Sequence, residues 1–493
     1  MKTLLSASFG TERSRLYGML LIVAGVFLIF FEVPLAFNVR EIIDDTCYLS
    51  WLHRFLLIPD ASCPNPYHFP GVAALWIPAG IAGRIGAFLF KSDSAHWIST
   101  FIGLTSYTCW AMSLVLVDRI VMELGAIRLR SILWVAAFLL AVPVLHYATA
   151  RCTMAHSGEI FLALLTIYLA IKRRYTASLL FAFWLCATRV NDAPILLVVF
   201  ARIWDERSQR IGGITRAQKR WAVGALLSSL IALIIIGNTV IFHNYGGVPS
   251  TGIITILRGV TGHELNRVLW GDSWGLIFTA PFWLLCLGSA PFFFTRLSWM
   301  ARACWLWMLI TFIVCVGWNG MGNSFGYRYS IGSYAATLIL WLEVLPMLSR
   351  TWDRVLKVCL IAEAVWLTHL TWVYDHFSSY WEVLTHWKGL ISFKDLVYPI
   401  TRFGLSPLGI LVKSLLYPVT RVEKFTGPFH SHLGRTALWI NGILTILAIA
   451  TTAFSMLNLR KQRSFFAPSI QDRSPFSSLG VGLFLLHGKQ RKS

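Results

Sequence analysis

About twelve long apolar runs cross the chain, and they limit its fold more than any other feature. A helix needs about 20 apolar residues to span the hydrocarbon of a membrane, and only helices satisfy all backbone hydrogen bonds within such continuous runs. Of the 493 residues, 13% are charged and 56% are hydrophobic, whereas a soluble domain has about 25% charged residues. The sequence therefore predicts an all-α integral membrane protein.

The runs predict about 12 transmembrane helices, within a range of about 11–13. The last of them is followed by a short basic tail, 458–493, and preceded by a segment, 374–435, that is rich in aromatic residues and histidine. Aromatic side chains gather at membrane interfaces and also suit sugar rings, so 374–435 is either an interfacial segment or a sugar platform. The expected spans are 16–37, 97–117, 131–149, 157–171, 175–188, 193–204, 221–242, 274–294, 301–318, 331–347, 354–373 and 436–457.

The positions of the basic residues predict the orientation. Most of the 43 Lys and Arg residues lie in alternate connections, and such connections face the cytoplasm. Both termini are then cytoplasmic, and the run 16–37 is a retained anchor rather than a signal peptide, because it is too long for one. The net charge of +20 suits contact with anionic membrane lipid, and no soluble segment is large enough for a nucleic-acid-binding domain.

The first outer loop, 38–96, begins with two adjacent acids, Asp44 and Asp45. Ionisable residues so close to lipid are functional-site candidates. We expect 47–58 to form a helix in the interface plane, and 71–90 to form an interfacial or re-entrant helix, since a full crossing would reverse the later loops. Cys47 and Cys63 can pair across this loop, although Cys152 is a third candidate on the outer side.

Two further outer regions carry polar residues that suit chemistry. One holds His156, Glu159, Arg189 and Asp192. The plainer interpretations are that Glu159 stabilises a helix start and that Arg189 pairs with Asp192 on one helical face. The other is a glycine-rich stretch with Arg328, whose planar fork of donors suits phosphate oxygens. Its plainer interpretation is a loop with one snorkelling arginine.

Together these segments resemble the GT-C superfamily, which are polytopic glycosyltransferases that use polyprenyl-phosphate-linked sugars, such as protein O-mannosyltransferases and aminoarabinose transferases. The resemblance covers roughly residues 15–350, and it depends on the order and the side of several short motifs. These are Asp44-Asp45-Thr46-Cys47-Tyr48-Leu49, Asn65-Pro66-Tyr67-His68-Phe69-Pro70-Gly71, Arg189-Val190-Asn191, Asn244-Tyr245-Gly246-Gly247, Trp274-Gly275-Leu276-Ile277-Phe278 and Phe325-Gly326-Tyr327-Arg328-Tyr329.

The resemblance implies a transmembrane catalytic module over 1–373, with its active site on the outer face of a bacterial inner membrane. Asp44 or Asp45 would act as the base that takes the acceptor proton, or as a metal contact, and Asp44 leads the matched motif. Arg189 and Arg328 would bind the donor phosphate. The candidates for a second acid or an acceptor contact are Glu159, Asp192, His156, Tyr48 and His68. The ligand spacing does not indicate a divalent metal.

The chemistry of transfer from a lipid phosphate agrees with this assignment. A positioned carboxylate can take the proton of an acceptor hydroxyl, and positive charge stabilises the departing phosphate. The acceptor is a glycan, a lipid or a protein. Three other classes stay open: a secondary transporter or flippase for lipid or oligosaccharide, a membrane O-acyltransferase with a histidine such as His146 or His369 at its centre, and a catalytically inert scaffold.

Overall fold

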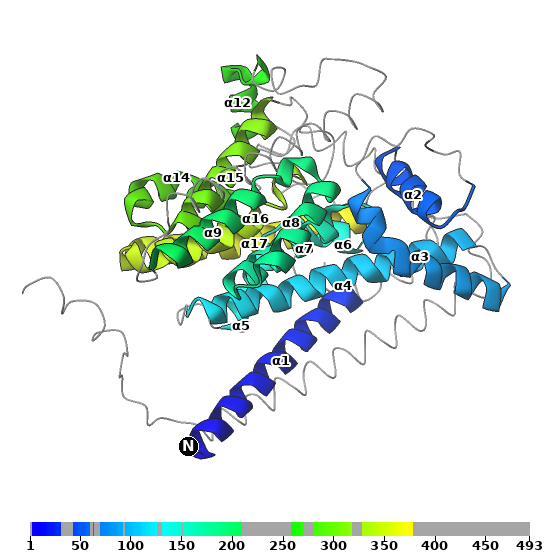
Figure 1. Cartoon of the computed structure of the whole chain (residues 1–493), viewed down its shortest axis with the longest axis horizontal. Helices are drawn as coiled ribbons and strands as arrows, with labels where there is room; N and C mark the ends of the chain where they lie inside the picture. Colours follow the sequence, from blue (N-terminus) through cyan, green and yellow to red (C-terminus); the bar gives the residue numbers. More distant parts are fainter. Residues whose placement is uncertain are drawn as a thin grey trace, which may run out of the picture. The chain divides into compact units, whose positions relative to one another are not determined.

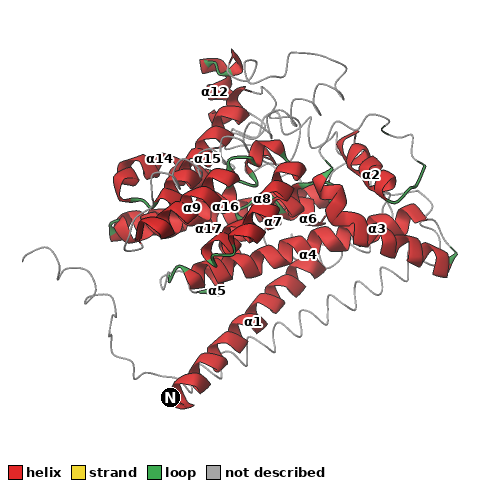
Figure 2. Cartoon of the chain, viewed as in Figure 1, coloured by secondary structure: helices red, strands yellow, loops and turns green. Residues whose placement is uncertain are grey.

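The fold was obtained as a computed structural model that describes residues 2–30, 43–59, 63, 70–91, 94–125, 131–149, 151–209, 258–270, 276, 280–317 and 328–377. These residues belong to one compact unit, Met1–Thr445, and the second unit, Ile446–Ser493, lies outside them. The described residues form helices joined by turns and contain no strand, as Figure 2 shows. The prediction of an all-helical chain is therefore confirmed for this part.

The helices follow the apolar runs of the sequence. In chain order they are α1 (Lys2–Phe30), α2 (Ile43–Phe55), α3 (Gly71–Phe90), α4 (Ser94–Glu123), α5 (Ile132–Leu140), α6 (Leu145–Thr149), α7 (His156–Ile171), α8 (Tyr175–Thr188), the 3-10 turn η3 (Val190–Asp192), α9 (Ile195–Gln209), α12 (Gly262–Trp270), α14 (Pro281–Phe293), η5 (Phe294–Arg296), α15 (Trp299–Gly317), η6 (Arg328–Ser330), α16 (Tyr334–Val344), η7 (Leu345–Met347) and α17 (Arg350–Phe377).

Three described helices or parts of helices are long and apolar enough to cross a membrane: Gly71–Phe90, Trp97–Glu123 and Trp299–Gly317. Shorter apolar helices, including α7, α8 and part of α16, pack among them. The predicted span 131–149 is divided into α5 and α6, because Pro143 cannot donate a backbone hydrogen bond. The predicted spans 221–242 and 436–457, the segment 378–435 and the tail 458–493 lie outside the described residues.

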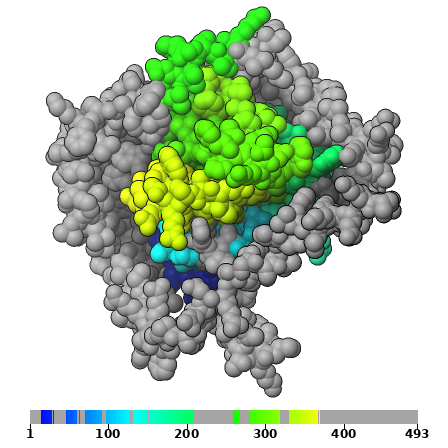
Figure 3. Space-filling view, turned by 90° about the vertical axis from the view of Figure 1, so that its left-hand side faces the viewer, coloured from blue at the N-terminus to red at the C-terminus, as the bar shows by residue number. Residues whose placement is uncertain are grey.

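The surface of the later helices is apolar as well as the core. Figure 3 shows α17 in yellow on one face of the molecule. The helix exposes Val355, Val358, Ile361 and Val365 at near-helical spacing, whereas Leu356, Leu360 and Glu363 are buried. A helix that is apolar on its outer side as well as its inner side is typical of a lipid environment.

The segment 47–58, which the sequence predicts to be helical, lies largely within a helix. α2 begins at Ile43 and buries Cys47, Tyr48 and Leu52, while Arg54 is exposed, so the helix has one wet face. A disulfide joins Cys47 to Cys63, which decides a pairing that the sequence left open. Cys152 is buried and forms no disulfide.

α2 and α3 lie next to each other (Figure 1), and two contacts, the earlier residues together and the later residues together, show that they run in the same direction. The Tyr48 ring packs against the Trp76 ring, with 6.3 Å between their centroids, and Arg84 donates to the carbonyl of Leu56 over 3.1 Å. The predicted helix 71–90 is thus present as α3. By length and composition α3 could cross a membrane fully. The sequence predicted an interfacial or re-entrant helix for these residues instead.

One end of the bundle is built from charged pairs. Arg15 of α1 pairs with Asp118 near the end of α4, and Lys172 after α7 lies 3.0 Å from Glu123. Asp205 near the end of α9 accepts hydrogen bonds from the first backbone N–H groups of α15. At its other end α7 begins at His156, close to the polar residues that the sequence predicts to be functional.

Candidate functional site

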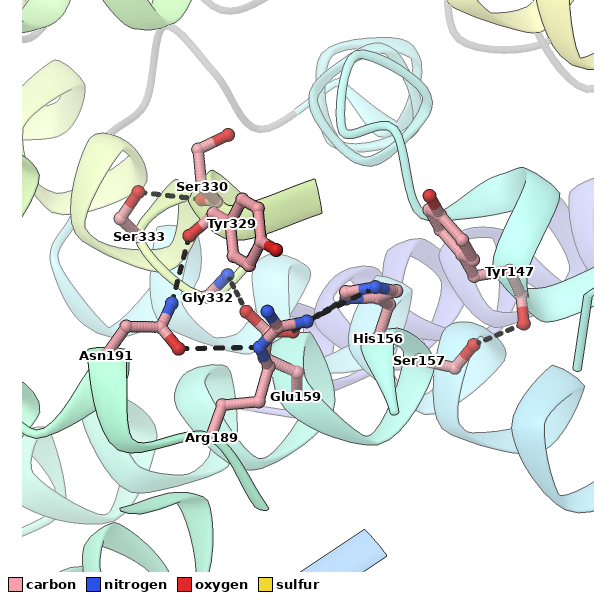
Figure 4. Close-up of polar contacts among 10 residues, drawn as sticks. All are labelled: Tyr147, His156, Ser157, Glu159, Arg189, Asn191, Tyr329, Ser330, Gly332 and Ser333. Atoms are coloured by element: carbon pink, nitrogen blue, oxygen red, sulfur yellow. Dashed lines mark hydrogen bonds and ion pairs between the residues drawn. The ribbon is translucent and has the colours of Figure 1, made fainter. Parts of the chain in front are cut away.

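Four segments far apart in the sequence meet at the start of α7. They are the first turn of α7, the end of α8 with η3, the stretch from η6 to the start of α16, and the C-terminal half of α15. Arg189 ends α8, because its backbone is extended (φ −149°, ψ 118°) and cannot continue the helix. Pro194 follows two residues after η3 and prevents α9 from beginning earlier. Figure 4 shows how the side chains lie.

Arg189 is held by two side chains of α7. Its Nη1 lies 3.6 Å from Oε2 of Glu159, and the same nitrogen lies 3.1 Å and 3.2 Å from the two ring nitrogens of His156. Glu159 and His156 are fully buried, and the Arg189 side chain is 11% exposed. The acid and the imidazole therefore lie behind the guanidinium, on its protein side.

The contacts of His156 define its tautomer. Its Nδ1 lies 2.8 Å from Oε2 of Glu159, and a carboxylate can only accept, so Nδ1 carries the proton. Arg189 can only donate, so Nε2 is left to accept from Nη1. The arrangement requires a neutral imidazole, whose ring packs 4.3 Å from the Tyr147 ring by centroids.

The segment from Tyr329 to Gly332 closes over this cluster. The backbone N–H of Gly332 donates to Oε1 of Glu159 over 2.9 Å, and Nδ2 of Asn191 donates to the Tyr329 carbonyl over 3.2 Å. The Tyr329 ring stacks on the guanidinium, with Cζ of Arg189 5.1 Å from the ring centroid. Arg189 Nε also donates to Oδ1 of Asn191 over 3.4 Å.

Asp192 lies beneath the same segment. Its carboxyl is fully buried, and neither oxygen has a hydrogen-bond partner within ordinary distance and angle. Burial raises the pKa of this carboxyl well above its ordinary value, and the negative charge of Glu159 raises it further, while Arg189 opposes both effects. Two acids that share a buried site resist simultaneous ionisation, and this effect favours the protonated form of Asp192.

The structure brings together four residues that the sequence placed in one polar region: His156, Glu159, Arg189 and Asp192. One of the two plainer interpretations is corrected, and the other is confirmed but incomplete. Arg189 and Asp192 do not share a helical face, because α8 ends at Thr188. Glu159 does lie in the first turn of α7, but its carboxylate also accepts from Gly332, 173 residues away along the chain.

The other predicted residues lie as follows. Asp44 and Asp45 occupy the first turn of α2, and Arg328 begins η6, next to Tyr329; the side chains of all three are outside the described part. Tyr48 is buried against Trp76. His68 is not among the described residues, nor is the side chain of His369, and His146 is buried beside Tyr147.

The register of α2 and α3 relates the acid pair to Arg189. Because Tyr48 lies beside Trp76 and the two helices run in the same direction, the start of α2 lies beside the first turn of α3. That turn touches the end of α8: a Cβ added at Gly71 would lie 2.4 Å from the carbonyl carbon of Ala187. Asp44 and Asp45 are thus one helix away from the segment that ends in Arg189.

Sequence reasoning missed Gly332 and the Trp307 indole. Trp307 affects the pKa of Asp192 from α15, and a tryptophan in an apolar run gives no signal of such a role. Among the residues that the structure describes, no group of three His, Cys, Asp or Glu side chains could hold a metal ion.

Comparisons with known proteins add no family to this geometry. No protein-family model, no curated protein and no solved structure matches the chain. The functional conclusion therefore depends on the residues themselves.

Proposed function

We propose that the chain is an integral membrane glycosyltransferase that moves a sugar from a polyprenyl-phosphate-linked donor to a glycan, lipid or protein acceptor. Asp44 or Asp45 takes the proton of the acceptor hydroxyl, and Arg189 with Arg328 stabilises the phosphate that leaves. About 12 helices span the bacterial inner membrane, both termini are cytoplasmic, and the site faces outward.

One observation carries the proposal: Arg189 is held at the end of the bundle where the acid-bearing helix α2 also begins. The guanidinium lies over Tyr329, directly after Arg328 in the chain, so both arginines belong to one region. A base and positive charge are the two groups that transfer from a lipid phosphate requires. The Cys47–Cys63 disulfide in the same loop agrees with an outer, oxidising compartment.

Transfer from defined donors tests the proposal. The purified protein, in vesicles that contain a polyprenyl-phosphate-linked sugar labelled in the sugar, is mixed with membrane, glycan and protein fractions as acceptors. We expect label to move to an acceptor. We also expect one of the variants Asp44→Asn and Asp45→Asn to lower the rate of transfer by about 100-fold or more, and the separate variant Arg328→Ala to do the same. Asp353→Asn is the control, since Asp353 pairs with Lys357 in α17, away from the site. Full transfer by both Asp variants would contradict the assignment of the base.

A proton-coupled secondary transporter is the second candidate. The buried acid pair, Glu159 and Asp192, favours it, because carboxyl groups that exchange protons within the membrane are typical of such proteins. Vesicles that enclose a pH-sensitive dye distinguish the two functions. Substrate-driven proton flux that Asp192→Asn abolishes, without any sugar transfer, would favour the transporter.

A further inference from the structure

The contacts of Arg189 divide into two sides. Glu159 and His156 contact it from the buried side, and both have no exposed surface. Tyr329 covers the face of the guanidinium, and its ring is partly exposed. Because the Arg189 side chain keeps a small exposed fraction and Glu159 and His156 keep none, a ligand from outside the bundle would meet Arg189 before the acid or the imidazole.

We infer that Glu159 and His156 are positioning residues that hold Arg189 for an anionic phosphate, and that neither of them acts on the acceptor. This inference rests on the proposed function for the identity of the ligand, a polyprenyl phosphate. It removes Glu159, His156 and Asp192 from the candidates for a second acid that touches the acceptor hydroxyl.

The contacts of Glu159 and His156 show how these two residues would help Arg189 to bind an anion. An arginine side chain loses rotamer entropy when it is fixed, so a guanidinium that is already fixed binds an anion more tightly. Glu159 holds Nη1 and is itself held by the N–H of Gly332. His156 accepts from Nη1 while it donates to Glu159, so each of the three groups contacts the other two. Displacement of any one group would move the guanidinium.

Charge leads to the same conclusion. Glu159 balances Arg189, and an imidazole that donates to Glu159 and accepts from Arg189 is neutral. A buried site tolerates such a balanced pair far better than an isolated charge. An ionised Glu159 that also served as an acceptor base would have to give up this balance during each turnover.

A double-mutant cycle on ligand affinity tests the inference. The full-length protein in nanodiscs is titrated with sugar-free polyprenyl phosphate and, as the uncharged comparison, with the corresponding polyprenol. The variants are Glu159→Gln, which keeps an oxygen for the N–H of Gly332, Arg189→Gln, and the two together. The double variant leaves no lone buried charge, so it folds even if one single variant does not.

We expect Glu159→Gln to raise the Kd for polyprenyl phosphate on the order of 10–100-fold, as the loss of a supporting partner does in other sites, with little change for polyprenol. The double variant should bind no more weakly than Arg189→Gln alone, because Glu159 acts through Arg189. His156→Gln should follow the same pattern. A residue that only supports the fold would alter the affinities for both lipids together.

Glu363→Gln is the matched control. Glu363 is also fully buried, but it accepts from the Phe282 N–H and the Tyr334 hydroxyl and contacts no arginine in the described part. Its substitution should leave the preference for phosphate unchanged. If Glu159→Gln weakens phosphate binding equally with and without Arg189, or does not weaken it at all, the inference is wrong. If the wild-type protein does not prefer polyprenyl phosphate to polyprenol, the proposed function fails and this inference fails with it.

Discussion

Gly332 and Asp192 touch so closely that no other residue type fits at position 332. A Cβ added there would lie 2.3 Å from Oδ1 and 2.6 Å from Oδ2 of the buried carboxyl. This contact brings the start of α16 against η3, and it leaves the Gly332 N–H directed at Glu159.

Gly332→Ala should therefore destabilise the protein by about 1–3 kcal/mol, because the added methyl group must displace Asp192 or the backbone. Thermal unfolding in detergent measures the change. Gly288→Ala is the control: Gly288 lies inside α14 with no atom within 4 Å of its added Cβ, and alanine suits a helix better than glycine by about 1 kcal/mol. Equal melting temperatures for the two variants would contradict the close contact.

Asp192→Asn should stabilise the protein at neutral pH by about 1–3 kcal/mol, because it removes a carboxyl whose ionised form is disfavoured by burial. The pKa of Asp192 is raised in the folded state, so between the unfolded and the folded pKa the folded protein keeps a proton that the unfolded chain has released. Stability from this group is present below the unfolded pKa and is lost as the pH rises through the folded pKa.

The measurement is the melting temperature against pH for both proteins. The melting temperature of the wild type should fall as the pH rises from the unfolded to the folded pKa of Asp192. The melting temperature of Asp192→Asn should not show this fall. Asp205→Asn should change stability in the opposite direction. Asp205 accepts hydrogen bonds from two backbone N–H groups of α15, so its substitution should destabilise the protein. A parallel pH profile for wild type and Asp192→Asn would show that Asp192 is ionised throughout.

Glu363→Ala should cost about 2–4 kcal/mol, because it leaves both the Phe282 N–H and the Tyr334 hydroxyl without an acceptor in the interior. Glu363→Gln should recover part of this loss through its one remaining oxygen. Denaturation of the purified variants measures both. Glu123→Ala, which removes a half-exposed partner of Lys172, should change stability by no more than about 1 kcal/mol. If Glu123→Ala lost as much stability as Glu363→Ala, burial would not explain the loss at Glu363.

Reduction of the Cys47–Cys63 disulfide, or Cys47→Ser with Cys63→Ser, should lower stability by about 3 kcal/mol, as expected for a closed loop of this size. Mass spectrometry after thiol alkylation should show two extra labels only when the protein is reduced before it is unfolded. The other seven cysteines form no disulfide and should be labelled in both cases after unfolding. Labels on all nine cysteines in the sample that was not reduced would contradict the pairing.

Apolar runs predicted the helices well where the chain supplies its own boundaries. The expected spans 157–171 and 175–188 correspond to α7 and α8, because Lys172, Arg173 and Arg174 end one run and an extended Arg189 ends the other. The break between α5 and α6 was missed, since Pro143 follows a hydrophobic stretch long enough to hide it.

The candidate site was predicted only in its residue types. Glu159, Arg189 and Asp192 were recognised as polar residues next to apolar runs, yet their partners depend on tertiary packing. No periodicity relates Glu159 to Gly332 or places the Gly332 backbone on Asp192. Local interpretation instead paired Arg189 with Asp192, because their spacing would suit a helix that in fact ends one residue earlier.

Three successive residues at the start of α16 bond to three different helices. Gly332 donates to Glu159 of α7, Ser333 accepts from Trp283 of α14, and Tyr334 donates to Glu363 of α17. The partner of Glu159 is made 173 residues after it, which at about 5–20 residues per second means on the order of 10–30 seconds of synthesis. During that interval the nascent chain carries Glu159 without its contact to Gly332, so the polar cluster is completed late, when α16 has emerged from the ribosome.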